Sequence, residues 1–360
     1  MEVEVREAPE VLRRQSAGVA GPIAELVGLL RRKPVHVVVT CARGSSAHAA
    51  TFGKHLIERH LGIPVAAAAP NITTIYGRRL ELRDQLFLAI SQSGRSDDLV
   101  ECAMMAKAAG ARTAAIVNDT GSALAAACDI VLPMAAGPEL SVAATKTFVA
   151  SLGALLHLVA AWANDAALAT ATDQLPDRLA AATGFDWSAA LDVLSASSSL
   201  VTIGRGPTLA IAREASLKLK ETCNLHAEAF SGAEFLHGPV ALVSTLYPIL
   251  MFMPTDEAAR GLRELAADLR GKGASVFVAE HGEPAAGRLP TLAPGHADTD
   301  AVCLIQSFYL LLIRLAERRG TMPATCPSAI TTAALRCTTM PSKTWSAATA
   351  CRDDVLIGCA

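Results

Sequence analysis

The sequence predicts an α/β fold made of two similar domains, and three observations indicate it. The chain has 360 residues, of which 51% are hydrophobic, so it is long and apolar enough for two domains with a large core. Short β-rich runs alternate with longer Ala-rich stretches of helical period, which is the pattern of β-α-β units and a parallel sheet. The alternation breaks at residues 165–187 and then begins again. We therefore expect two parallel sheets, each covered by helices on both faces.

The first half contains five candidate strands, each short and apolar. They are Val35–Thr40, Pro64–Ala68, Leu86–Ile90, Thr113–Val117 and Ile130–Pro133. Apolar residues recur at intervals of three and four in Ser45–Arg59 and Asp97–Ala109, which predicts helices between these strands. The run Phe148–Ala163 is shorter than a membrane span and contains Ser151 and His157, so we expect a buried helix and no contact with a membrane.

The second half repeats this organisation after a polar, broken joint. Its candidate strands are Leu200–Ile203, Ile249–Met253 and Ser275–Glu280. Both halves open alike, because an apolar strand leads into a glycine-bearing turn, Arg43-Gly44-Ser45 or Gly204-Arg205-Gly206, and a helix follows. From Thr321 on, Thr, Ser, Ala and Pro dominate without helical or strand period, and four of the nine cysteines lie there. We expect residues 321–360 to form a loosely ordered tail.

Composition and short motifs exclude several classes of function. The 32 Lys and Arg residues balance 34 Asp and Glu residues, so a nucleic-acid partner is not expected. The segment Met1–Arg14 is charged throughout and lacks the apolar core of a secretory signal, which favours a cytoplasmic protein with free thiols. CxxC pairs, HExxH, Walker A and GxGxxG motifs are all missing from the sequence. We therefore expect neither a bound metal nor a nucleotide cofactor.

The strongest chemical signal is Ser91-Gln92-Ser93-Gly94-Arg95-Ser96, between a predicted strand and a predicted helix. The first N–H groups of a helix are unpaired and its dipole is positive there, so they bind an anion together with nearby hydroxyl and amide groups. An ordinary serine cap and turn is the alternative. The segment Cys41–Ser46 repeats the arrangement after another strand. Because carboxyl ends of parallel strands share one edge of a sheet, both turns can face one phosphate group.

The second half supplies groups that can move protons. Glu214, Lys218 and Glu221 share one face of a predicted helix, which is either a solvated face with paired charges or the wall of a substrate crevice. His237 precedes Gly-Pro in the segment Glu234–Pro239 and is a candidate acid or base, with a structural hydrogen-bonding role as the alternative. The segment His226-Ala227-Glu228 lies between these two groups.

From about Arg6 to Gly320 the chain resembles the SIS (sugar isomerase) family, in particular the isomerase half of glucosamine-6-phosphate synthase and the stand-alone SIS-type deaminases. The segments that carry the resemblance are Arg6–Glu10, Ala42–Ala50, Ser91–Ser96, Glu139–Lys146, Gly204–Glu221 and His226–Pro239. The resemblance implies two tandem SIS domains, each a flavodoxin-like five-stranded parallel sheet flanked by helices, in a homodimer with sites near the subunit interface. It divides the chain into an N-terminal helical segment (1–20), domains at 21–165 and 185–320, and the tail (321–360).

The resemblance also implies roles for individual residues. The substrate phosphate would be bound by the side chains that match the family's phosphate ligands, namely Ser46, Ser91, Gln92, Ser93 and Ser96. Gly44, Ser45, Val142 and Ala144 match positions at the sugar. The family's proton-shuttling glutamate matches Glu221, its substrate-contacting lysine matches Lys218, and its ring-opening histidine, supplied by the partner subunit, matches His237. One carboxylate within reach of C1 and C2 suits an aldose–ketose shift.

Two departures from the family shape the expected function. The chain enters the sugar domain almost at once, without the synthase's glutaminase domain, so we expect a deaminase that converts glucosamine 6-phosphate to fructose 6-phosphate and ammonia. After Gly320 the family's tail lysine is missing and Lys343 stands in no matching context, as a frameshift would produce. The alternatives are another phosphosugar isomerase, a fructosamine-6-phosphate deglycase, an inactive ligand-binding product and a non-catalytic phosphosugar sensor. A DNA-binding region, which usually accompanies a sensor role, is not visible.

Overall fold

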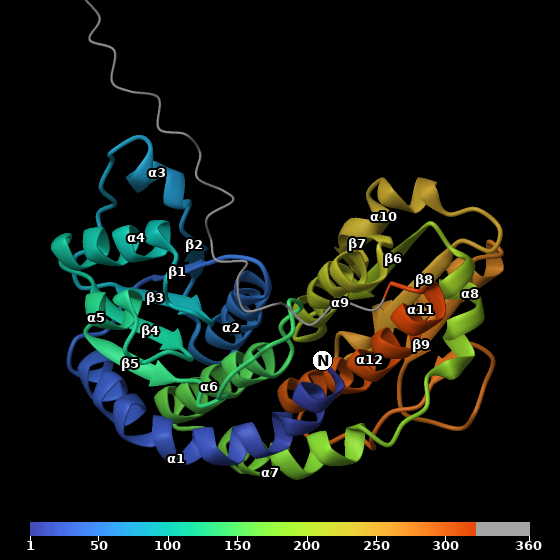
Figure 1. The fold of residues 1–360 in the computed structure, drawn as a ribbon, viewed down its shortest axis with the longest axis horizontal. Coiled ribbons are helices and arrows are strands. Elements are labelled where there is room, and N and C mark those ends of the chain that lie inside the picture. Colours follow the sequence, from blue (N-terminus) through green and yellow to red (C-terminus); the bar gives the residue numbers. More distant parts are fainter. Residues whose placement is uncertain (322–360) are drawn as a thin grey trace, which may run out of the picture. The chain divides into compact units, whose positions relative to one another are not determined.

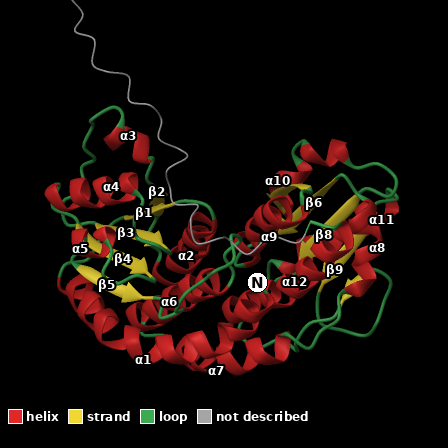
Figure 2. Ribbon diagram, viewed as in Figure 1, coloured by secondary structure: helices red, strands yellow, loops and turns green. Residues whose placement is uncertain are grey.

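The structure is a computed structural model that describes residues 1–321, and two five-stranded parallel sheets organise this part of the chain (Figures 1 and 2). The first sheet consists of β1 (Val38–Ala42), β2 (Val65–Ala67), β3 (Leu86–Ser91), β4 (Arg112–Val117) and β5 (Ile130–Pro133). The second consists of β6 (Ser199–Gly204), β7 (His226–Ser231), β8 (Pro248–Phe252), β9 (Ser275–Ala279) and β10 (Arg288–Leu289). The expected tail and the frameshift hypothesis lie outside the described residues, apart from Thr321.

The two sheets have the same topology. The strand order is β2-β1-β3-β4-β5 in the first and β7-β6-β8-β9-β10 in the second. In each sheet the chain leaves its first strand for one edge and then returns to the other side, so the order reverses between β1 and β3 and between β6 and β8. Ligands of open α/β sheets bind beyond the carboxyl ends of the strands at such a point.

Helices cover both sheets and fill the space between them. In the first half they are α1 (Glu2–Arg32), α2 (Ser45–Leu61), α3 (Pro70–Thr74), α4 (Asp97–Ala108), α5 (Ala123–Ala127) and α6 (Lys146–Ala163). In the second half they are α7 (Ala166–Ala182), α8 (Leu191–Ala196), α9 (Thr208–Cys223), α10 (Gly232–Leu236), α11 (Ala259–Gly271) and α12 (Ala297–Arg319), with 3₁₀ turns at Ser188–Ala190 and Pro239–Leu242. Two tandem sheets of five parallel strands confirm the expected α/β class.

One hydrophobic core joins the two halves. It takes Leu88 and Ile90 from β3 and Leu250 and Phe252 from β8, all fully buried. Helices α1, α6, α7 and α12 pack against one another between the sheets, and α2 packs against α9. Because apolar burial contributes about 25 cal/mol per Å² removed from water, this shared core stabilises the arrangement of the two halves. It therefore also fixes α9 relative to the first sheet.

Several expected element boundaries differ from those in the structure. The N-terminal helix continues past position 20 to Arg32, even though Pro9 and Pro22 lie within it, because its buried face packs against α6 and α7. The polar joint at 165–187 is mostly the helix α7, which begins at an Asp165 cap that accepts N–H bonds from Ala167 and Leu168. The edge strands β7 and β10 were not among the candidate strands, since β7 is polar and half-exposed and β10 has two residues.

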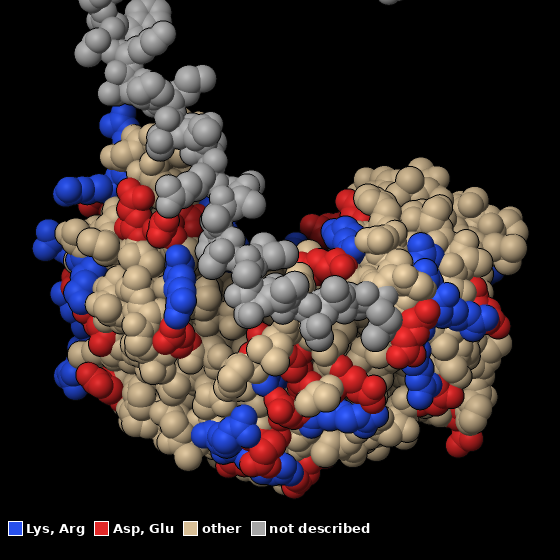
Figure 3. All heavy atoms as spheres, viewed as in Figure 1, with Lys and Arg blue, Asp and Glu red and all other residues tan. Residues whose placement is uncertain are grey.

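Two helices within residues 1–321 are long and apolar enough to cross a membrane. They are α6 and α12, and 78% and 89% of their apolar windows are buried inside the protein. The buried helix expected at Phe148–Ala163 is thus confirmed as part of α6. On the face of the molecule in Figure 3, Lys and Arg side chains are interspersed with Asp and Glu side chains, in keeping with the balanced composition.

Candidate functional site

The serine-rich turn connects β3 to α4 and has a shape that requires a glycine at position 94. Gly94 has φ of +61°, and a Cβ atom at this position would overlap Ser122. Ser91, which is 5% exposed, accepts a hydrogen bond from the Gly94 N–H at 3.1 Å. A glycine is required here, because other residues adopt positive φ only at a cost and have no room. The turn therefore has a defined conformation before any ligand arrives.

Ser96 occupies the N-cap position of α4, but its hydroxyl makes no capping hydrogen bond. The simple capping role that the sequence left open does not describe this serine. Ser93 accepts only a long bond of 3.4 Å from the Arg95 N–H, and Ser93, Ser96 and Gln92 are partly exposed. These side chains can therefore turn toward a ligand that approaches the N-terminus of α4.

The glycine turn after β1 lies beside the serine-rich turn, since β1 and β3 are neighbours in register. Gly44 has φ of +54° and precedes α2, whose first residues Ser45 and Ser46 are partly exposed. Arg43 pairs with Asp98 in the first turn of α4. This ion pair ties the two turns together, and it neutralises a carboxylate that would otherwise repel an anion. The structure thus brings together two helix N-termini and five candidate serines.

Glu214, Lys218 and Glu221 form a connected network on α9. The Lys218 ammonium group lies 2.8 Å from Glu221 and 3.4 Å from Glu214. Glu214 is fully buried and the Lys218 side chain is 1% exposed, whereas the Glu221 side chain is 36% exposed. A solvated helix face is therefore excluded. A ligand can reach Glu221, and the other two groups support it from inside the protein.

Opposite charges keep the buried part of this network ionised. Burial alone would raise the pKa of Glu214, but Lys218 and His48 lower it overall. Burial alone would lower the pKa of Lys218, but Glu214 and Glu221 raise it overall. Each group favours the charged form of its neighbour, as expected for opposite charges a few ångströms apart. Lys218 is therefore a fixed positive charge beside the Glu221 carboxylate.

His48 connects this network to the first domain. Its Nδ1 atom lies 2.7 Å from a Glu214 carboxylate oxygen, although the two residues are 166 positions apart. Ser45, in the glycine turn three residues before His48, also contributes to lowering the pKa of Glu214. The charged face of α9 therefore adjoins the first turn of α2. Sequence reasoning missed Glu214 as an anchor between the domains, although it placed the residue on the correct helix face.

Two further residues at this place were not site candidates. Tyr309 on α12 is fully buried, and its hydroxyl has no hydrogen-bond partner among the described residues. Burial and the negative charges of Glu214, Glu139 and Glu221 raise the pKa of Tyr309 well above its usual value. Glu139 accepts a hydrogen bond from the Thr145 N–H at 2.7 Å and lies in a segment that carried the family resemblance. No sequence signal marked Tyr309.

Val142 and Ala144, the expected sugar contacts, lie in the loop between β5 and α6. Val142 is 66% exposed and Ala144 is partly buried, so both can contact a ligand. His237 is exposed at the C-terminal end of α10, where it lines a hollow with Arg205, Gly232 and Leu262. The structure therefore does not bring His237 to the α9 network of the same chain.

A separate cavity in the second half contains none of the candidate site residues. It has a volume of about 170 Å³ and lies beyond the carboxyl ends of β8 and β9. Its Arg178 and Arg263 are paired with Asp300 and Glu280. Within residues 1–321 there is no group of three or more His, Cys, Asp or Glu side chains that could hold a metal ion.

The fold and the site define an α/β protein with two hydroxyl-bearing helix N-termini side by side in its first domain and a buried ionic network in its second. The chain belongs to the SIS domain family, whose model matches residues 31–161 and 193–279. The resemblance to this family is thus confirmed.

Three relatives are informative. A glutamine–fructose-6-phosphate aminotransferase (isomerizing) of Symbiobacterium thermophilum is 33% identical over 302 residues, which is 78% of this chain and 49% of that protein. A solved structure from Silicibacter pomeroyi DSS-3, provisionally described as a phosphosugar isomerase, is 43% identical with a TM-score of 0.84 and covers 89% of this chain and 98% of that chain. The C-terminal domain of a glucosamine-fructose-6-phosphate aminotransferase from Francisella tularensis is 27% identical with a TM-score of 0.78, over 89% and 96% of the two chains. The chain spans about half the length of the curated relatives it matches.

Proposed function

We propose that the chain is an enzyme that converts glucosamine 6-phosphate and water to fructose 6-phosphate and ammonia. One observation carries the proposal: the Glu214–Lys218–Glu221 network is linked through the 2.7 Å contact of His48 with Glu214 to the first turn of α2, beside the serine-rich turn. A substrate whose phosphate is bound at the two turns would extend its sugar toward α9. The aminotransferases and the phosphosugar isomerase among its relatives support a phosphorylated sugar as substrate.

The turns bind the phosphate in this proposal. The Ser46, Ser91, Ser93 and Ser96 hydroxyls, the Gln92 amide and the N–H groups that start α2 and α4 donate to its oxygens. Each hydrogen bond to a charged group contributes about 1.5–3 kcal/mol, so several of them hold a phosphate. Gly44 allows the close approach, and Ser45, Val142 and Ala144 contact the sugar.

Glu221 moves the proton in the proposed reaction. It removes the C2 proton of the open-chain amino aldose and returns a proton to C1, while the amine nitrogen loses one proton and the aldehyde oxygen O1 gains one, which leaves an imine at C2 and a hydroxyl at C1. Water then adds at C2, the C2–N bond breaks, and the nitrogen leaves as ammonia. Lys218 holds Glu221 in place from inside the protein through their 2.8 Å contact. The exposed carboxylate beside a fixed cation is suited to this transfer because it is both reachable and oriented.

Ring opening requires an acid or base at the ring oxygen, and we assign it to His237 of a second copy of this chain. His237 is exposed and lies beside Leu236, which is 53% exposed, and Leu242, which is 52% exposed. Exposed apolar side chains around a polar group are typical of protein interfaces. Mixing Glu221→Gln and His237→Ala variants should restore part of the activity that each lacks, because one of the two mixed sites then has both groups. Failure to restore activity would contradict this assignment.

A plain aldose–ketose isomerase is the second candidate, favoured by the 43% identical structure described as a phosphosugar isomerase. One assay decides between the two. Purified protein is incubated with glucosamine 6-phosphate, and ammonia and fructose 6-phosphate are measured together, while a parallel sample receives glucose 6-phosphate. Equal amounts of both products support the deaminase. Fructose 6-phosphate from glucose 6-phosphate alone supports the isomerase, and no product from either substrate would contradict both.

A further inference from the structure

We propose that Glu4, in the first turn of α1, is a positioning residue that holds the loop Glu139–Thr145 in the shape that receives the sugar. The proposal rests on the proposed function, because it takes Val142 and Ala144 in this loop as sugar contacts. Glu4 itself does not touch the substrate. It acts through the loop backbone, at a point far away in the sequence.

The contact between Glu4 and the loop is made by one carboxylate oxygen. Glu4 Oε1 accepts hydrogen bonds from two consecutive backbone N–H groups, Leu140 at 2.5 Å and Ser141 at 3.0 Å. Glu4 is 6% exposed, so little water competes for these donors. Hydrogen bonds to an ionised acceptor are shorter and stronger than those between neutral groups. This contact therefore fixes the direction of the loop immediately before Val142.

The loop has few other anchors at this end. Leu140 is 70% exposed and Val142 is 66% exposed, so burial of their side chains does not hold the backbone. Ala143 and Thr145 are buried, but they lie toward the far end, where Glu139 accepts the Thr145 N–H. The near end of the loop thus depends on Glu4, and the far end on Glu139 and the packing beneath it.

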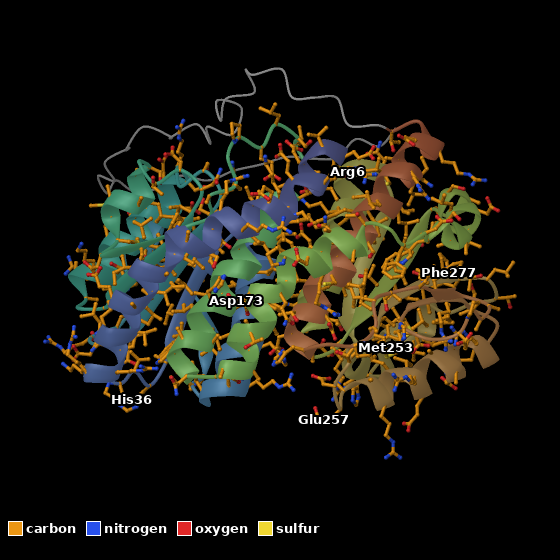
Figure 4. The ribbon with its side chains drawn as sticks, turned by 90° about the horizontal axis from the view of Figure 1, so that it is seen from below. Arg6, His36, Asp173, Met253, Glu257 and Phe277 are labelled. Carbon is orange, nitrogen blue, oxygen red and sulfur yellow. The ribbon has the colours of Figure 1, made fainter. Side chains whose placement is uncertain are left out.

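Side chains of α6 and α12 hold the first turn of α1 in place. The Gln306 side chain on α12 donates a 2.7 Å hydrogen bond to the Val5 carbonyl, and Lys146 at the start of α6 lies 2.5 Å from Glu7. Figure 4 shows the start of α1, marked by Arg6, beside α12. Tyr309 lies about one helical turn after Gln306 on α12, where the charges of Glu214, Glu139 and Glu221 raise its pKa. Contacts with α6 and α12 therefore hold the first turn of α1, and Glu4 with it, in place.

The charge state of Glu4 agrees with this role. Burial alone would raise the pKa of Glu4, but hydrogen bonds from Ser141 and from the Leu140 and Ser141 N–H groups lower it overall. The carboxylate is therefore ionised at neutral pH, and both N–H groups meet a full negative charge.

The first test measures the loop and does not depend on turnover. Amide hydrogen exchange of a peptide covering residues 138–143 is compared in the wild type, Glu4→Gln, Glu4→Ala and the matched control Glu10→Gln. Glu10 lies on the same helix and is exposed in a pair with Arg13. We expect faster exchange in Glu4→Ala, an intermediate rate in Glu4→Gln, which keeps one acceptor oxygen, and no change in the control. Unchanged exchange in Glu4→Ala, or in Glu4→Gln if the alanine variant does not fold, would overturn the proposal.

The second test measures the sugar. The KM for glucosamine 6-phosphate should rise about tenfold in Glu4→Gln while kcat changes less than about twofold, since the proton-moving groups on α9 are untouched. The dissociation constant of inorganic phosphate should stay unchanged, because both turns are intact. If the wild type shows no turnover, the proposed function fails, and the dissociation constants of fructose 6-phosphate and inorganic phosphate replace the kinetics. Faster amide exchange in the loop of Glu4→Gln, together with a wild-type dissociation constant for fructose 6-phosphate, would then overturn the positioning role.

Discussion

The two sheets share one strand order, but the loops at their carboxyl edges differ in chemistry. After β3 the chain reads Ser91-Gln92-Ser93-Gly94-Arg95-Ser96, whereas after β8 it reads Met253-Pro254-Thr255-Asp256-Glu257. The first loop offers partly exposed hydroxyls to an anion. In the second loop the Thr255 hydroxyl donates to Asp300 at 2.7 Å, and Asp256 and Glu257 lie next to Arg59, so no hydroxyl is left for an anion. A repeated topology therefore does not repeat the ligand, because the side chains at the edge decide what binds.

The glycine turns show the same difference. The Thr208 hydroxyl in the second turn is buried and fully used, since it accepts from the Arg205 N–H at 3.0 Å and donates to the Phe252 carbonyl at 2.8 Å. The matching serines of the first turn, Ser45 and Ser46, are partly exposed. The ionic network lies on α9 of the second domain, and α2 of the first domain contributes His48 to it. One domain is thus suited to hold the phosphate and the other to move protons.

Replacing Glu221, the proposed base in the second domain, should have the largest effect, because it should reduce turnover without reducing phosphate binding. In Glu221→Gln, kcat should fall by about 10³-fold, within the range that general acid–base catalysis contributes. The dissociation constant of fructose 6-phosphate should change little, because the first domain is intact. Steady-state kinetics and calorimetry measure both. The matched control, Glu264→Gln on the exposed face of α11, should keep wild-type values. Retained turnover in Glu221→Gln would show that another group moves the proton.

Removing the buried cation should test what holds α9 in place. Lys218→Met leaves Glu214 as an unpaired buried carboxylate apart from His48, so the free energy of unfolding should fall by about 3–5 kcal/mol. Urea denaturation measures the change. Lys272→Met, which removes an exposed lysine paired with Asp268, should change the free energy by less than about 1 kcal/mol. Equal effects of the two substitutions would contradict the buried network.

The anion-binding edge should belong to the first domain alone. Ser93→Ala combined with Ser96→Ala should weaken binding of every 6-phosphorylated ligand by about 100-fold or more, as the loss of two hydrogen bonds to a charged group, at about 1.5–3 kcal/mol each, predicts. Thr255→Ala, in the corresponding loop of the second domain, should have no effect on these ligands. Calorimetric titration with fructose 6-phosphate tests both variants. Similar weakening in the two domains would show that the phosphate is not bound where we place it.

Acidification should produce the smallest change and should narrow the difference between wild type and Lys218→Met. The pKa of Glu214 is lowered below its reference value of 4.5, so its stabilising contribution is complete above that pH and is lost as the pH falls through the lower folded value. In Lys218→Met the unpaired carboxylate costs stability at neutral pH, and protonation relieves that cost. The difference in unfolding free energy should therefore shrink toward acidic pH. A constant difference would contradict the assigned charges.

The sequence predicted the parts of the fold and site that depend on local pattern. The five strands of the first half and Leu200–Ile203, Ile249–Met253 and Ser275–Glu280 are apolar, and strands occur at all of these places. The edge strand β7 was missed because polar residues make up half of it and β-branched residues are lacking. The joint at 165–187 contains Pro176, which α7 nevertheless accommodates.

In the site, too, the sequence predicted the residues that form a local pattern. The two turns and the α9 face were visible because their residues are consecutive or share a helical spacing. The contact of His48 with Glu214 joins residues 166 positions apart, and that of Glu4 with Leu140 joins residues 136 apart, so no local pattern indicated either. Tyr309 resembles an ordinary core residue in the sequence, and only its unpartnered hydroxyl near three carboxylates distinguishes it.

Exchange of ligand hydrogen with the solvent tests most directly whether the first domain binds the phosphate while the second moves the proton. The wild type is incubated with fructose 6-phosphate and ammonium in D₂O, and deuterium at C1 is followed by NMR, with fructose and ammonium as the control that lacks the phosphate. The account predicts deuterium at C1 of fructose 6-phosphate, none in fructose, and none in fructose 6-phosphate with Glu221→Gln. Binding of fructose 6-phosphate to the wild type without any exchange at C1 would contradict the claim that the phosphate edge and the α9 network form one catalytic site.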